Sequence, residues 1–115
     1  MRRGEVRLVD LDPSRGSEAD KLRPAVVVSN DRANAAAVRS GRAVVTVVPV
    51  TSNVNRVYPF QVLIPEGTAG LRLDSKAQAE HVRSVAVDRL GPALGRLPTD
   101  LMGRLDAALR LHLAL

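Results

Sequence analysis

Short runs of β-branched residues, interrupted by glycine and proline, are the feature that most limits what this chain can fold into. Such runs favour β-strands, and we expect strands within residues 5–11, 23–29, 43–50, 60–64 and 94–97. The valines at 26–28 are typical of a strand that is buried on both faces. Many short strands joined by tight turns predict a small barrel or a rolled sheet.

Two helices are expected beside these strands. Asn30 can cap a short helix over residues 32–39, and Gly41 can end it. After Pro98, Thr99 can cap a C-terminal helix whose apolar positions share one face at helical spacing. These positions are Leu101, Leu105, Ala108, Leu109 and His112. The sequence therefore predicts a mainly β fold that ends in one α-helix.

Three stretches carry signals that interrupt or blur the strand pattern. Pro49 cannot donate a hydrogen bond to a neighbouring strand, so it should place the end of its strand at an edge or a bulge. Residues 80–90 fit both helical and strand spacing, and both assignments stay open. Gly91 and Pro92 should break the chain before a last short strand.

Length and charge bound the class of protein. A chain of 115 residues fits one domain and can bury a core. Lysine and arginine exceed aspartate and glutamate by 17 to 12, which gives a net charge of +5. This excess favours an anionic partner such as nucleic acid, although an acidic protein partner or an arginine-rich proteome would account for it equally well.

The residues that are missing or scarce exclude several kinds of site. There is no cysteine, so disulfides, thiolate metal sites and cysteine nucleophiles are excluded. With two histidines a metal site is poorly supplied, and we expect neither a metal nor a cofactor. Tyr58 and Phe60 are the only aromatic residues, which argues against an RNA-binding sheet that stacks bases on rings.

The location of the protein is predicted from its hydropathy. No apolar run approaches the ~20 residues that cross a bilayer. The first residues alternate and include Glu5 and Asp10, unlike a signal peptide. We therefore expect a soluble, cytoplasmic protein that does not contact a membrane.

Arg23 and Thr51 occupy the same kind of position, where an apolar strand meets a polar loop. Pro24 fixes its own φ and biases Arg23 toward an extended conformation. The arginine fork suits a phosphate, and the threonine hydroxyl can donate to a phosphate oxygen. If the two strands are neighbours, both side chains could reach one pocket. Taken alone, the residues fit a surface arginine and a strand-end threonine better.

Other polar residues have a functional and a structural interpretation. Glu18 could be a general base near that phosphate, or a solvated carboxylate paired with Lys21. Ser17 could equally form a turn. Further amides and hydroxyls could bind base edges or serve in turns and caps. These are Asn34, Ser52, Asn53 and Asn55.

The two histidines invite comparison with nucleases that use one histidine as base and another as acid. Nothing in the sequence brings His81 and His112 together, so we disfavour that mechanism. His112 lies on the apolar face of the last helix and fits a packing role. His81, beside Glu80 and Arg83, is the better candidate for a substrate contact.

The order and spacing of several segments resemble one family. These segments are residues 4–6, 10–13, 16–18, 21, 23–30, 48–52, 71–75, 81–84, 89–90 and 109–115. Together they resemble PemK/MazF-type toxins over nearly the whole chain, as one domain of residues 1–115. The resemblance implies an SH3-like β-barrel of the CcdB/PemK kind that works as a homodimer.

The resemblance also implies an activity and partners. It implies a metal-independent endoribonuclease that cuts single-stranded RNA at short preferred sequences. RNA carries its own nucleophile, the 2′-OH beside the scissile phosphate, so the enzyme must move protons and stabilise charge. A cognate, MazE-like antitoxin is implied as well, with an acidic, partly disordered tail that covers the RNA groove.

Roles for individual residues follow from the same resemblance. Arg23 is the main phosphate-binding and acid-side group, Thr51 assists at the phosphate, and Glu18 is the proposed base. The remaining predicted residues line the RNA path. These are Ser17, Lys21, Asn34, Ser52, Asn53 and His81.

Two positions depart from the family pattern, and two other functions remain possible. Arg7 stands where tryptophan is usual, and His81 where glutamine is common, so no cleavage motif is transferred. One alternative is a CcdB-type gyrase-inhibiting toxin, which relies on an aromatic residue near its C-terminus that residues 113–115 do not supply. The other is a noncatalytic nucleic-acid-binding barrel, against which the scarcity of aromatic residues counts mildly.

Overall fold

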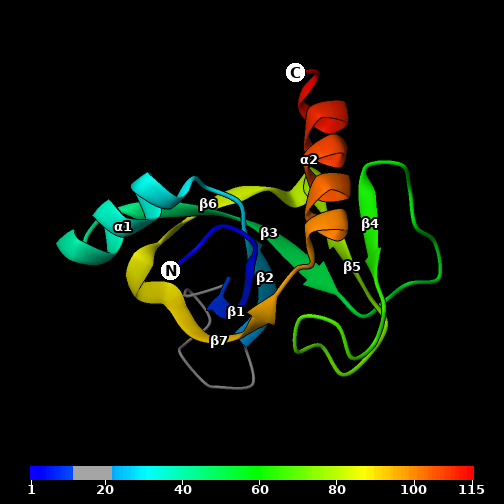
Figure 1. Ribbon diagram of the computed structural model, residues 1–115, viewed down its shortest axis with the longest axis horizontal. Helices are drawn as coiled ribbons and strands as arrows, with labels where there is room; N and C mark the ends of the chain where they lie inside the picture. Colours follow the sequence, from blue (N-terminus) through cyan, green and yellow to red (C-terminus); the bar gives the residue numbers. More distant parts are fainter. Residues whose placement is uncertain (12–21) are drawn as a thin grey trace.

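The computed structural model describes residues 1–11 and 22–115 of the chain (Figure 1). Its strands are β1 (Glu5–Asp10), β2 (Leu22–Val27), β3 (Val44–Thr51), β4 (Gln61–Ile64), β5 (Ser75–Gln78), β6 (Arg83–Ala86) and β7 (Leu90–Arg96). Its α-helices are α1 (Asp31–Ser40) and α2 (Thr99–Leu113), with short 3₁₀ turns η3 (Ala79–His81) and η4 (Val87–Arg89). The predicted mainly β fold with a C-terminal helix is confirmed.

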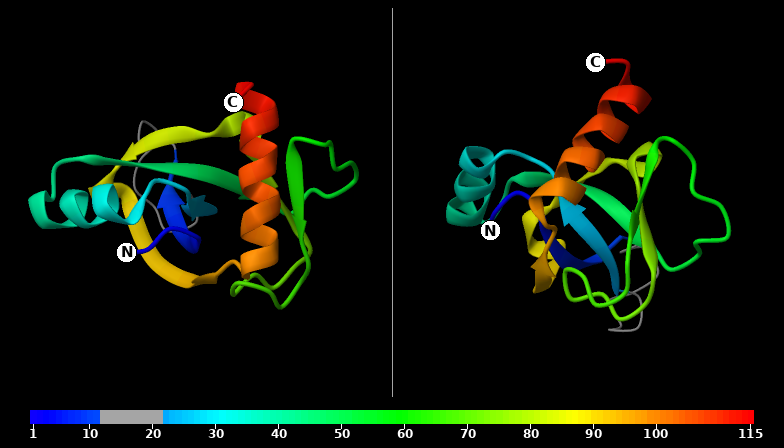
Figure 2. Two further views of the ribbon diagram at one scale, coloured as in Figure 1. Left: turned by 45° about the horizontal axis from the view of Figure 1, so that its top comes forward. Right: turned by 45° about the vertical axis from the view of Figure 1, so that its right-hand side comes forward.

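The strands form one antiparallel sheet in the order β4-β5-β3-β2-β1-β7, and β6 pairs with β3 beside this path. The sheet bends around the core, as Figures 1 and 2 show. Among the described residues the pairing does not return to its starting strand. The predicted barrel or rolled sheet therefore takes the form of an open, curved sheet, because β4 and β7 at its two ends do not pair.

The central strands β2 and β3 are buried on both faces. On β2, Val26 joins the larger hydrophobic cluster, which also contains Leu105 of α2. Its neighbours Ala25 and Val27 join a second cluster, which contains Ala37 of α1. Successive side chains of a strand point to opposite faces, so α1 and α2 cover different faces of the same strand and lie apart on the sheet (Figure 2).

The helix ends predicted from the sequence are confirmed for α1, and the predicted cap of α2 is wrong. The Asn30 side chain accepts a hydrogen bond from Ala33 N at 2.8 Å, and Gly41 ends α1 at φ 68°, so both predictions are confirmed. The expected Thr99 cap is wrong, because α2 begins at Thr99 and no side chain caps it. No helix in the described ranges is long and apolar enough to cross a membrane.

The apolar face predicted for α2 holds for most of its length. Leu101, Leu105 and Ala108 are buried, and Leu109 packs against them. His112 is exposed, so a partly buried packing role is wrong for it. Its ring nevertheless contacts Phe60, with the ring centroids 6.3 Å apart.

Pro49 lies inside a central strand, so of the edge or bulge expected there, the edge is wrong. It pairs with Ala25 of β2 on one side. On the other side β3 pairs with β6 as far as Val47 and with β5 from Val50 onward. Pro49 stands between these two pairings, where a residue without an N–H is easily accommodated.

Residues 80–90, for which helix and strand both remained possible, lie in several short elements. Residues 79–89 form η3, β6 and η4, and neither a long helix nor a single strand. The break expected at Gly91 and Pro92 is wrong, because β7 runs through both residues and pairs with β1. This strand ends the sheet, where proline is tolerated, and its pairing shifts register twice.

Arg7, which departs from the family pattern, links β1 to β7. Its guanidinium donates to Glu5 Oε1 at 2.8 Å and to the Gly91 carbonyl at 3.0 Å. Burial raises the pKa of Glu5, but hydrogen bonds from the Arg7 side chain and the Arg2 N–H outweigh it, so the pKa of this carboxyl lies below its ordinary value. An ion pair within the chain thus occupies this position.

The loop between β4 and β5 packs directly onto β7. A Cβ atom on Gly70 would lie 2.1 Å from the Leu94 carbonyl oxygen, and one on Gly95 would lie 2.5 Å from the carbonyl carbon of Ala69. Only glycine fits at such a close approach of two backbones. We call this close approach of residues 69–70 to residues 94–95 the glycine contact, and it bridges the two ends of the open sheet without pairing strands.

Candidate active site

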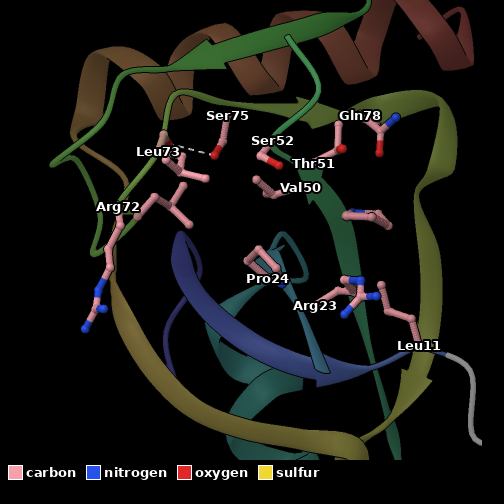
Figure 3. Close-up of a pocket in the computed structure, with 12 residues that line it drawn as sticks. Leu11, Arg23, Pro24, Val50, Thr51, Ser52, Arg72, Leu73, Ser75 and Gln78 are labelled. Carbon is pink, nitrogen blue, oxygen red and sulfur yellow. Dashed lines mark hydrogen bonds between the residues drawn. The ribbon is translucent and has the colours of Figure 1, made fainter. Parts of the chain in front are cut away.

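Arg23 and Thr51 line the same cavity, which has a volume of about 480 Å³ (Figure 3). The register explains why. Strand β2 is antiparallel to β3, with Ala25 opposite Pro49. The same register carried outward by two residues brings Arg23 opposite Thr51. The condition set by the sequence, that the two strands be neighbours, is therefore met.

The local environments of these two side chains differ. Arg23 is exposed, and its Nη1 donates to the Leu22 carbonyl at 3.1 Å. Thr51 is half-buried, and its Oγ1 accepts a hydrogen bond from Asn53 N at 3.2 Å. A hydroxyl that accepts in this way can still donate its own hydrogen. Both groups can therefore donate into the cavity.

Two walls can be distinguished in the cavity. We call Arg23 and Pro24 of β2, with Pro49, Val50 and Thr51 of β3, the strand wall. We call residues 71–73, which belong to the loop between β4 and β5, the loop wall. The other described lining residues are Leu11, Ser52, Ser75 and Gln78.

The loop wall is held by hydrogen bonds as well as by the glycine contact. The buried Ser75 hydroxyl donates to the Leu73 carbonyl at 2.9 Å. Gly67 N donates to the Leu71 carbonyl at 2.8 Å. Leu71 is itself buried in the larger core cluster. No role was expected for this wall or for Gln78 from the sequence, and the one sequence signal for the wall is the resemblance of residues 71–75 to the family.

The cavity is positively charged within the described part of its lining. Arg23 contributes a guanidinium group, Arg72 adds a second positive charge on a side chain that points away from the other lining residues, and none of the described lining residues is a carboxylate. Such a surface attracts anions. In the described ranges, no three histidine, aspartate or glutamate side chains gather in a way that could hold a metal ion.

The structure corrects the prediction for Asn34. This side chain is completely buried. Its amide donates to the Ser29 carbonyl at 2.8 Å, and its oxygen accepts from the Ser29 hydroxyl. That hydroxyl in turn accepts from Thr46 N at 3.1 Å. Asn34 therefore ties α1 to the ends of the strands and has no surface for RNA.

The other predicted RNA contacts are spread more widely. Ser52 lines the cavity. Asn53 and His81 are exposed and lie outside the lining. The Asn53 side chain accepts from Asn55 N at 3.3 Å, as in a turn, and His81 Nε2 lies 4.0 Å from Glu80 Oε2. Three further predictions lie outside the described residues. They concern Ser17, Glu18 and Lys21.

Comparison with known proteins gives the family. A family model described as "PemK-like, MazF-like toxin of type II toxin-antitoxin system" matches residues 2–113. The chain belongs to this family. It is 63% identical to "Endoribonuclease MazF9" of Mycobacterium tuberculosis, over all of this chain and 98% of that protein. It is 53% identical to "Probable endoribonuclease MazF1" of the same organism, over 78% of this chain and 98% of that protein.

Solved structures in the PemK/MazF family share the fold. One is an endoribonuclease from a mycobacterial species in complex with its cognate antitoxin, with a TM-score of 0.77 and 26% identity over all of this chain and 96% of that one. Another is MazF from Deinococcus radiodurans, with a TM-score of 0.77 and 26% identity over all of this chain and 97% of that one. The expected family is therefore confirmed.

Proposed function

We propose that this chain is an endoribonuclease toxin that cleaves single-stranded RNA without a metal ion. The observation that carries the proposal is the meeting of Arg23 and Thr51 in one positively charged cavity. The 63% identity to a protein named as an endoribonuclease supports the same reaction class. A gyrase-inhibiting toxin and a noncatalytic barrel, the two alternatives, gain no support from these relatives.

The reaction we propose begins at the RNA itself. The 2′-OH attacks the adjacent phosphorus and its proton passes to a base, while the bond from phosphorus to the 5′-oxygen breaks and this oxygen takes a proton from the acid-side group. The products are a 2′,3′-cyclic phosphate and a 5′-hydroxyl. Arg23 binds the phosphate and is the acid-side group at the leaving oxygen. The Thr51 hydroxyl donates a hydrogen bond to a non-bridging oxygen. Glu18 is the proposed base.

The RNA path extends beyond the cavity in this proposal. Ser52 contacts RNA at the rim, and the family resemblance supports Ser17, Lys21, Asn53 and His81 as further contacts. Asn34 is left out because its side chain is buried. An extended strand of RNA is longer than one cavity, so exposed polar residues around it are suitable contacts.

The proposed partners are a cognate antitoxin and a second copy of this chain in the cytoplasm. One solved structure with the same fold is a complex with an antitoxin, and an acidic tail would complement the net charge of +5. An apolar groove between β4 and α2, lined by the exposed Leu63 and Leu111, is the surface we assign to the second copy. Light scattering should then give the mass of a dimer.

The proposal is tested by mixing purified protein with single-stranded RNA in excess EDTA and analysing the ends. We expect cleavage to continue, because none of the proposed steps uses a metal ion. The upstream fragments should carry a 2′,3′-cyclic phosphate and the downstream fragments a 5′-hydroxyl. Loss of all cleavage in EDTA, or fragments with a 5′-phosphate, would contradict the proposed chemistry.

A further inference from the structure

Two glutamines lie directly opposite each other on neighbouring strands. Gln61 opens β4 and Gln78 ends β5, and the two are partners in the antiparallel register. They are the same residue type at the same level of the sheet. Their hydrogen bonding differs, and this difference indicates a role for one of them.

Both the oxygen and the nitrogen of the Gln61 amide are hydrogen-bonded within the protein. Its side chain is buried, its oxygen accepts from Tyr58 N at 3.1 Å, and its nitrogen donates to the Glu80 carboxylate at 2.5 Å. These bonds tie the loop before β4 to η3. Gln61 therefore has a structural role, as is usual for a buried amide.

The Gln78 amide makes no hydrogen bond to any described residue. It stands at the start of η3 without capping it, and it is half-buried on the lining of the cavity. Figure 3 shows its amide on the Thr51 side of the cavity. Because this amide is not fully buried and is not hydrogen-bonded to a described residue, its donor and its acceptor can both bind a ligand in the cavity.

Gln78 also lies close to the proposed chemistry along the strand. Lys76, two residues earlier on β5, pairs with Thr51 of β3. Among the described lining residues Gln78 is the one carboxamide, and the Ser75 hydroxyl is already used by the Leu73 carbonyl. Arg23 and Thr51 are assigned to the phosphate. Ser52 is assigned to the rim, so Gln78 is a further group that can contact what is attached to that phosphate.

We propose that Gln78 reads one RNA base next to the scissile phosphate. This inference rests on the proposed ribonuclease function. A carboxamide offers a donor and an acceptor side by side, and the exposed edges of unpaired bases offer complementary pairs. One well-placed bidentate contact is worth about tenfold to a hundredfold in discrimination between bases. Gln78 is thus a specificity-determining residue of this site.

The test compares cleavage-site preference in variants of Gln78. The wild type, Gln78→Leu and Gln78→Glu are incubated with a random pool of single-stranded RNA, and the cut ends are sequenced. In Gln78→Leu the preference at one position beside the cut should fall by about tenfold or more, while the other positions keep theirs. A carboxylate only accepts hydrogen bonds, so Gln78→Glu should shift that position toward guanine, whose pairing edge offers two donors.

Gln61→Leu is the matched control. It should lower Tm, because it removes the hydrogen bonds of Gln61 to Tyr58 N and to the Glu80 carboxylate, and it should leave the preference profile unchanged. An unchanged profile in both Gln78 variants, while the wild type cuts RNA, would overturn this inference alone. A folded Gln78→Leu protein that cuts no RNA would also overturn it, because the residue would then belong to the chemistry. A wild type that cuts no RNA would overturn the proposed function as well.

Discussion

The strand wall and the loop wall face the same cavity but are held in different ways. The strand wall stands on β2 and β3, each of which pairs with strands on both sides and is buried on both faces. The loop wall is held by the glycine contact, one serine hydroxyl and turn hydrogen bonds. The proposed reacting groups, Arg23 and Thr51, belong to the stiffer wall. Groups that need accurate placement gain most from rigid elements, so we expect the loop wall to shape the cavity and not to react.

The largest effect that this comparison predicts is a loss of RNA cleavage when a residue of the strand wall is changed. Arg23→Ala should reduce RNA cleavage by about a thousandfold or more, because it removes the main donor to the charge on phosphorus. Tm should stay unchanged, because the Arg23 side chain is exposed. Cleavage rates and thermal unfolding of the same preparation give both quantities. A rate near that of the wild type would remove Arg23 from the chemistry.

A smaller effect, on stability, is expected on the loop wall from Gly70→Ala. The new methyl group would meet the Leu94 backbone, so unfolding should become easier by about 3 kcal/mol. Gly67→Ala is a matched control, since Gly67 has the same φ of 79° and no atom within 4 Å of an added Cβ. Its cost should be only the backbone strain, about 1 kcal/mol. Equal costs in urea unfolding would mean that the glycine contact does not hold this wall.

The smallest effect, a modest rise in KM, is predicted for a change at Arg72 of the loop wall. In Figure 3 the Arg72 side chain points away from the other lining residues, and it is exposed. Arg72→Ala should therefore raise KM by roughly two- to fivefold through lost attraction to RNA, with kcat unchanged. Steady-state kinetics at two salt concentrations would measure this. A fall in kcat comparable to that of Arg23→Ala would mean that the two walls share the chemistry.

The difference between the walls also explains what could be predicted from sequence. The strand wall follows from local patterns, because valine runs mark β2 and β3 and the polar residues that flank them mark Arg23 and Thr51. For Arg23 and Thr51 to line one cavity, it was enough that β2 and β3 pair with each other. The roles given to Glu18, Ser17 and Lys21 stay predictions, because these residues lie outside the described ranges.

The features that sequence reasoning missed depend on contacts between distant residues. Nothing local to Gly70 or Gly95 indicates that the backbone of Gly70 approaches Leu94 or that the backbone of Gly95 approaches Ala69. Asn34 was given an RNA contact because amides serve both ligands and caps, and only its burial beside Ser29 decides between these roles. The expected break at Gly91 and Pro92 failed for a similar reason, since pairing with β1 overrides the local preference of both residues.

The position of β2 and β3 between two hydrophobic clusters has a consequence for how the molecule comes apart. Helix α1 packs on one face of these strands and α2 on the other. If either helix detached, apolar side chains would meet water on the strands that hold Arg23 and Thr51. A partly opened protein would therefore lose its reacting groups at the same moment as its core. RNA cleavage and the cooperatively folded structure should therefore be lost at the same temperature on heating.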